Sequence, residues 1–214
     1  MDQALKRKVL DELAWQPGFD EAHIGVTARG GVVKLTGHVG SYAEKCAAES
    51  AIGHVTGVRT ISEELKIRDL SGAGYGDEEI AEQALGVISW DLAVPEDSVK
   101  IRIEKGWVTL TGEVDWRFQK QAAEADIRNL RGVMGVSNAI EIRPKTLVCD
   151  VERQIKAAFR RNAEFDAENI VITADGTAIT LTGQVGSYWA RTLAADTAWS
   201  APGVTRVHDL LTVG

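Results

Sequence analysis

A stretch of seven residues occurs three times in this chain of 214 residues, at 33–39, 108–114 and 179–185. Each copy reads as an apolar residue, a polar residue, Leu-Thr-Gly, any residue and Val. The glycines of the copies, Gly37, Gly112 and Gly183, are 75 and 71 residues apart. The chain therefore consists of three similar segments, each of which must adopt the same supersecondary structure.

An amphipathic helix is predicted near the start of every segment. Apolar residues recur there at i, i+4 and i+8, which places them on one face of a helix. These residues are Leu5, Val9 and Leu13 in the first segment, Ile80, Ala84 and Ile88 in the second, and Val151, Ile155 and Phe159 in the third. Trp15 and Trp90 stand at equivalent positions just after this pattern, and Arg161 takes that place in the third segment.

Three strands are predicted in each segment. Two short runs of alternating apolar residues flank a glycine-containing turn, which indicates a β-hairpin whose second strand is the repeated stretch. A third alternating run closes each segment, at 61–67, 136–142 and 207–213. A helix between the second and third strands returns the chain, so these two strands are expected to be parallel.

This second helix is predicted to begin near Ser41, with Glu44 completing a capping box. A Gly-Val pair ends it in every segment, because glycine suits the position after a helix. The apolar residues expected to face the sheet are Ala43, Ala47, Ala48, Ile52 and Val55, then Phe118, Ala122, Ala123, Ile127 and Leu130, then Trp189, Leu193, Ala194, Ala198 and Ala201.

The predicted fold class is α+β, with three tandem α-β-β-α-β domains. Each domain is expected to form a three-stranded mixed sheet with two helices on one face, leaving the other face more open. The predicted domains are 1–68, 77–143 and 147–214. Glycine-rich residues 69–76 and the shorter stretch 144–146 are expected to be linkers.

Composition and charge exclude several classes of protein. Apolar residues make up 44% and charged residues 26%, as in ordinary globular proteins. The net charge of −7 resides mostly in the middle segment, where residues 71–143 carry 8 basic and 13 acidic side chains. Nucleic-acid binding requires a basic surface and is not expected. Cys46 and Cys149 stand at non-equivalent positions, so both are predicted to be reduced thiols.

The Leu-Thr-Gly-x-Val strand, the alanine-rich second helix and the Gly-Val pair before an alternating strand together resemble the BON-domain family, named for bacterial OsmY and nodulation proteins. The resemblance covers nearly the whole chain as three tandem domains. It implies an α-β-β-α-β fold, a bacterial source, and a role in holding proteins to phospholipid surfaces, often in the envelope and in osmotic stress. The family has no shared catalytic residues.

No enzyme motif, cofactor site or metal site is predicted. No nucleophile elbow, phosphate-binding loop or dinucleotide fingerprint occurs, and no Ser/His/Asp set recurs between segments. The four histidines form no pair with metal-ligand spacing. A Gly-x-x-Gly pair at Gly37 and Gly40 matches an RNA-clamping loop, but Asp115 replaces the second glycine in the middle segment. We therefore expect a protein that is not an enzyme.

The candidate residues are three glycines and a group in the second segment. Gly37, Gly112 and Gly183 are interpreted as structural glycines that let a helix backbone approach the sheet. Trp107 is expected on the open face with Thr109 and Thr111, and Trp116 in the turn before the second helix. These four residues are a candidate interaction surface, because exposed tryptophan suits a protein interface or a lipid headgroup layer. The alternative is packing between neighbouring domains.

The leading functional hypothesis is a non-enzymatic binding or scaffold protein that contacts a phospholipid surface or another protein in osmotic or general stress. One alternative is a small-ligand or cation-binding stress protein. Another is self-assembly through exposed sheet edges. No run of about 18 apolar residues is present, which predicts no transmembrane segment. The charged N-terminus predicts a cytoplasmic protein, or a periplasmic one if a signal sequence was removed in cloning.

Overall fold

A computed structural model of the chain describes residues 2–16, 23–68, 74–143, 151–161 and 169–214. Each of the three segments forms one α-β-β-α-β domain, so the predicted fold class is confirmed. The first domain contains α1 (Gln3–Ala14), β1 (Ile24–Arg29), β2 (Val32–Val39), α2 (Tyr42–Gly53) and β3 (Thr60–Ile67). The second contains α3 (Asp77–Trp90), β4 (Val99–Glu104), β5 (Trp107–Val114), α4 (Arg117–Arg128) and β6 (Gly135–Ile142). The third contains α5 (Val151–Arg161), β7 (Ile170–Asp175), β8 (Ala178–Val185), α6 (Tyr188–Trp199) and β9 (Arg206–Val213).

Each sheet has the predicted mixed topology. The strand orders are β1-β2-β3, β4-β5-β6 and β7-β8-β9, with the hairpin strands antiparallel and the last two strands parallel. The repeated stretch is thus the central strand of every sheet. Its apolar members face the helices and are buried, as Leu35, Leu110 and Leu181 show.

Each domain has its own core. The predicted face of the first helices packs on the core in all three domains, with Val9, Ile80 and Phe159 excluded from solvent, although Ile88 is only partly buried. The second helices agree with the sequence interpretation only in part. Phe118 was expected in the core but is 56% exposed, and Trp189 is only half-buried. Of the predicted positions, Ala123, Ile127, Ala194 and Ala198 are buried, and Ala190 is a buried position that the sequence interpretation did not include.

The repeated glycines allow a close approach between strands. Gly37, Gly112 and Gly183 have φ of +126°, +133° and +130°, a region that favours glycine. A side chain at these positions would collide with the backbone carbonyl oxygen of His23, Ser98 or Asn169, just before the first strand of each sheet. The close neighbour on this side is thus the residue that precedes the first hairpin strand, and the approach of a helix backbone stays a prediction.

In every domain, a side chain accepts a hydrogen bond from a backbone N–H group of one edge strand. Glu63, Asn138 and Asp209 are equivalent residues of the edge strands β3, β6 and β9, and each accepts a hydrogen bond from the backbone N–H two residues on. A basic residue of the second helix pairs with the carboxylate in two domains, as Lys45 with Glu63 and Arg191 with Asp209, both at 2.8 Å. Such protection makes these edges poorer templates for another chain.

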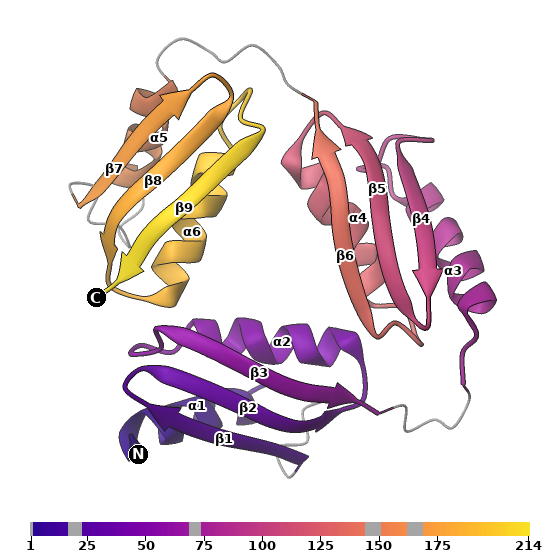
Figure 1. The fold of residues 1–214 in the computed structure, drawn as a ribbon, viewed down its shortest axis with the longest axis horizontal. Coiled ribbons are helices and arrows are strands. Elements are labelled where there is room, and N and C mark those ends of the chain that lie inside the picture. Colours follow the sequence, from indigo (N-terminus) through magenta and orange to yellow (C-terminus); the bar gives the residue numbers. More distant parts are fainter. Residues whose placement is uncertain (1, 17–22, 69–73, 144–150, 162–168) are drawn as a thin grey trace.

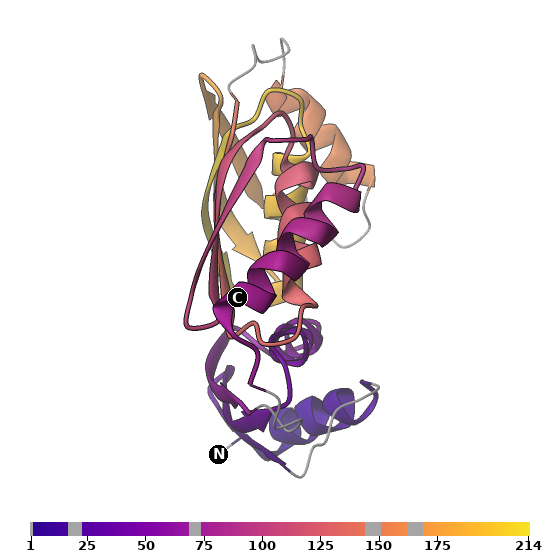
Figure 2. The same cartoon turned by 90° about the vertical axis from the view of Figure 1, so that its right-hand side faces the viewer.

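The three domains form a flat triangular ring (Figure 1). The second helices, α2, α4 and α6, lie on the inner side of the ring. The sheets present their open faces on one side of the ring, and the helices lie on the other (Figure 2). The first and third domains also approach each other, since Asp2 and Gly214 line one cavity of about 350 Å³.

Candidate functional site

The structure places three of the four candidate surface residues together. Trp107, Thr109 and Thr111 alternate with buried Val108 and Leu110, so they lie on the open face of the second sheet. The indole of Trp107 lies over Gly135 of the neighbouring strand and remains 52% exposed. Trp116 is exposed too, but it stands beyond the far end of β5 as the N-cap residue of α4. The four residues do not form one surface.

More strongly exposed apolar side chains lie at the ends of the first helices. Trp15 follows the last residue of α1, Trp90 is the last residue of α3, and they are 85% and 87% exposed. Leu92, two residues after Trp90, is fully exposed. The third domain has exposed Arg160 and Arg161 at the end of α5. We call these three sites the helix tips.

Sequence reasoning did not assign the helix tips to a surface. The signal was present, because Trp15 and Trp90 are equivalent residues that follow the apolar pattern of their helices without belonging to its buried face. The first helices all lie on the side of the ring opposite to the open sheet faces (Figure 2). The helix tips therefore belong to a different side of the molecule from Trp107, Thr109 and Thr111.

Contacts between domains connect the second helices in a cycle. At the first–second interface, Tyr42 at the start of α2 packs against the core of the second domain. Its burial, together with the neighbouring Cys46, raises the pKa of the Tyr42 hydroxyl to about 12. At the second–third interface, Arg117 at the start of α4 pairs with Asp196 of α6 at 2.5 Å. The same guanidinium lies 4.9 Å from the ring centre of Trp199.

The third–first interface completes the cycle. Tyr188 at the start of α6 lies against Gly53 at the end of α2, and the adjacent Trp189 stacks on His54 with ring centres 3.9 Å apart. Trp189 thus joins two domains, whereas the sequence interpretation had placed it in a core. Packing between neighbouring domains, which the sequence suggested for other tryptophans, involves Trp189 and Trp199.

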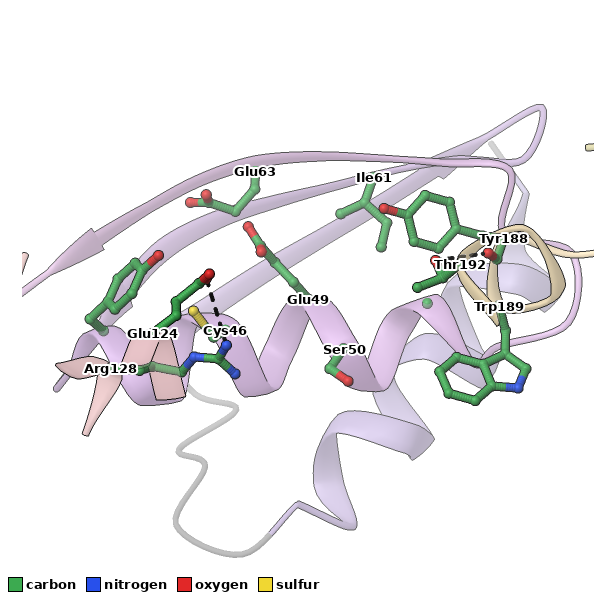
Figure 3. A pocket seen from close by; sticks show the side chains of 12 residues that line it. Cys46, Glu49, Ser50, Ile61, Glu63, Glu124, Arg128, Tyr188, Trp189 and Thr192 are labelled. Carbon is green, nitrogen blue, oxygen red and sulfur yellow. Dashed lines mark hydrogen bonds and ion pairs between the residues drawn. The ribbon is translucent and has the colours of Figure 1, made fainter. Parts of the chain in front are cut away.

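A cavity of about 450 Å³ lies where all three domains meet (Figure 3). It is lined from the first domain by Cys46 and Glu49, from the second by Arg128 and from the third by Tyr188 and Trp189, among others. The Cys46 thiol is free, as predicted, and burial raises its pKa. Cys149 lies outside the described residues.

The charges around this cavity are largely compensated by one another. Glu63 is paired with Lys45, and Glu124 lies 3.8 Å from Arg128. The remaining carboxyl group belongs to Glu49, whose pKa is raised by burial and then by the neighbouring Glu63. Among the residues that the structure describes, no group of three or more His, Cys, Asp and Glu side chains is arranged to hold a metal ion.

Another carboxyl pair lies between a helix tip and an inner helix. Burial, followed by the nearby carboxylate of Asp91, raises the pKa of Asp126 on α4 to about 6. Asp91 directly follows Trp90 at the end of α3, and it accepts a hydrogen bond from the backbone N–H of Ala93. Protonation of Asp126 removes the repulsion between these two groups.

Comparison with known proteins identifies the family of each domain. The BON domain family model matches residues 1–69, 76–144 and 150–214. Osmotically-inducible protein Y of Escherichia coli (strain K12) is 31% identical over 146 residues, which cover 66% of this chain and 73% of that protein. None of the helices in the described parts of the chain is both long and apolar enough to span a membrane.

Two solved structures show weaker similarity. They are of CdsD, a structural protein of the type III secretion system of Chlamydia trachomatis, at 15% and 16% identity, with 99% and 100% of this chain covered. The alignments cover 92% and 99% of those chains, with TM-scores of 0.27 and 0.26, which carry no structural argument. The three family matches, together with the identity to the Escherichia coli protein, show that this chain belongs to the BON-domain family.

Proposed function

We propose that this protein is a non-enzymatic binding and scaffold protein that contacts a phospholipid surface through its helix tips, in osmotic or general stress. The observation that carries this proposal is the exposure of two equivalent tryptophans, Trp15 and Trp90, at the ends of α1 and α3. Tryptophan is enriched at membrane–water interfaces, where its ring is half in the apolar layer and its N–H reaches water.

The energetics favour several tips acting together. Burying a large apolar side chain contributes about 2 to 3 kcal/mol, which supports only weak binding by a single tryptophan. Leu92 lies beside Trp90 in the sequence and adds to the second tip. Arg160 and Arg161 contribute about 1 kcal/mol each near an anionic leaflet. Three weak tips on one rigid body bind far more tightly than one, because binding of the first raises the local concentration of the others.

Family membership agrees with this proposal. BON domains are associated with phospholipid or protein interaction, and the related Escherichia coli protein is named for its induction by osmotic conditions. The side with the helix tips thus replaces the surface around Trp107 and Trp116 as our first candidate for the contact. We keep the second-domain surface of Trp107, Thr109 and Thr111 as the comparison surface.

Flotation with vesicles tests the proposal. Wild-type protein is mixed at low salt with vesicles of neutral lipid or of neutral lipid containing anionic lipid, and the bound fraction is collected. We expect binding to both, stronger to the anionic vesicles because of the arginines of the third tip. Absence of binding to either kind of vesicle at low salt contradicts the proposal.

The central cavity favours a second candidate function, the binding of a small molecule. Its volume of about 450 Å³ lies in the range of small-molecule sites, and aromatic and polar residues of three domains line it. A thermal-shift screen over K⁺, Na⁺, Ca²⁺ and common metabolites tests this function, because a specific ligand raises the melting temperature by mass action. A flat response across the screen counts against it.

A further inference from the structure

The three interfaces of the ring are built at equivalent positions. Tyr42, Arg117 and Tyr188 are the first residues of α2, α4 and α6, and they are related by the repeat offsets of 75 and 71. Gly53, Arg128 and Trp199 are the last residues and obey the same offsets. Arg117 lies near Trp199, and Tyr188 lies against Gly53. Tyr42 and Arg128 line the same cavity, so the start of each helix meets the end of the next one.

Only the third–first interface joins domains that are not consecutive in the chain. The other two connect neighbours, which a short segment of chain already holds close together. The first and third domains are separated by the whole second domain, so their contact must offset more chain entropy. We call the contact of Tyr188 and Trp189 with Gly53 and His54 the closing contact.

Gly53 has features that a closing contact requires. It lies in the last turn of α2 and is absent from the residues with positive φ, so no turn geometry demands glycine there. Glycine within a helix is destabilising relative to alanine, so a glycine there needs another reason. A Cβ atom at position 53 would lie 3.2 Å from Tyr188 Cδ1, tighter than an ordinary contact. The space that glycine leaves is therefore occupied by a side chain of the third domain.

His54 is held in place to receive Trp189. Its Nδ1 lies 2.7 Å from the carbonyl oxygen of Ser50, one turn earlier in α2. The imidazole meets the indole at 35° between ring planes. Such contacts between aromatic rings stabilise an interface beyond the area that they bury.

We propose that the closing contact locks the ring and thereby determines whether the three helix tips reach one surface together. In the closed ring, α1, α3 and α5 lie on the same side (Figure 2). When the contact is broken, the first and third domains are related only through their separate contacts with the second domain, and the tips lose their fixed arrangement. This inference rests on the proposed function for its binding consequence, whereas the closure itself is independent of it.

Small-angle X-ray scattering and vesicle flotation of the full chain test this inference together. Trp189→Ala removes the stacking on His54, and Gly53→Leu places a bulky side chain where Tyr188 lies. We expect each variant to raise the radius of gyration by roughly a tenth or more, because the closed ring is more compact than linked domains. We expect apparent vesicle affinity to fall about tenfold or more as simultaneous engagement is lost.

The chain offers a matched control. Phe118 is the equivalent of Trp189 on α4 and is 56% exposed, so Phe118→Ala should change neither measurement. Circular dichroism establishes that each variant retains its folded domains. Joining the termini of Trp189→Ala through a flexible linker of about ten residues should restore much of the compactness and of the binding.

The outcomes separate the two proposals. An unchanged radius of gyration in both folded variants overturns the closing contact. An increased radius with undiminished vesicle binding overturns the link between closure and binding and leaves the proposed function standing. If wild-type protein binds no vesicles, the proposed function fails and the link with it, while the radius of gyration still decides whether the closing contact exists.

Discussion

The helix tips and the inner helix ends differ in how the repeats use them. At the tips, two domains place the same residue at the same position, and Trp15 and Trp90 both face solvent. The inner helices begin at Tyr42, Arg117 and Tyr188 and end at Gly53, Arg128 and Trp199, and Arg117 and Tyr188 each contact a neighbouring domain. The last residues of the inner helices thus all differ, whereas the tips repeat tryptophan in two domains and carry Arg161 in the third.

This difference indicates two kinds of target. A residue repeated without an internal partner suits an external surface that is the same for every domain. Residues that vary between repeats suit internal partners, because each interface must be complementary to one neighbour only. In this sense Arg117 is complementary to Trp199, and Tyr188 is complementary to Gly53. If these partners were exchanged, the guanidinium would lose its aromatic ring and the tyrosine ring would lose the space that glycine leaves.

The largest expected difference is in stability. Trp199→Ala removes a half-buried indole that packs on the third core and under Arg117, and we expect a loss of about 2 kcal/mol in the free energy of unfolding. Trp15→Ala removes an indole that is 85% exposed, and we expect a change within about 0.5 kcal/mol. Urea unfolding followed by circular dichroism measures both. Equal losses in the two variants would remove the distinction between tips and inner ends.

A smaller effect is expected at the second–third interface. Arg117→Ala loses both the pair with Asp196 and the contact with Trp199, and we expect it to weaken this interface by about 1 kcal/mol. Arg117→Lys keeps the charge but loses the planar stacking on the indole, so it should restore only part of the loss. A double-mutant cycle with Trp199→Ala measures the coupling. A coupling of zero would mean that the cation and the ring stabilise the protein independently.

A pH-dependent effect links the second tip to its inner helix. The folded-state pKa of Asp126 is about 6, above its ordinary value of 3.8, so the folded state binds the proton more tightly than the unfolded state. The stability from this group is therefore fully present below pH 3.8 and is lost as the pH rises through about 6. Asp126→Asn should reduce this dependence when unfolding midpoints are compared between pH 4 and pH 7. The same pH dependence in the variant would assign the effect to other carboxyl groups.

Most of the fold could be predicted from the sequence because local patterns determine it. Alternating and helical periods identify the buried residues, and the position of Leu35, Leu110 and Leu181 in the repeated stretch predicts three central strands. Because the three copies can be compared, and Asp115 replaces the second glycine in the middle one, the sequence argued against a phosphate-binding or RNA-clamping loop. It did not reveal that Gly37 approaches the strand beside it, because strand register depends on the pairing between strands.

The contacts between domains could not be predicted in the same way. Trp189 was expected in the core because its apolar character fits either a core or an interface, and periodicity does not distinguish the two. The relation of Tyr188 to Gly53 joins residues 135 positions apart in the chain, and no local pattern records it. The equivalence of Trp15 and Trp90 was visible in the sequence. Their position outside the apolar pattern indicated exposure, but its extent depends on where the helices end relative to the sheets.

The central claim is that the helix tips contact the lipid. Its most direct test compares vesicle binding by two double variants, Trp15→Ala with Trp90→Ala, and Trp107→Ala with Trp116→Ala. Each removes two exposed indoles, from the tips in the first case and from the second-domain sheet and turn in the second. We predict that the tip variant loses about tenfold or more in apparent affinity, while the other variant binds like wild type. Retained binding by the tip variant together with lost binding by the other would contradict the account.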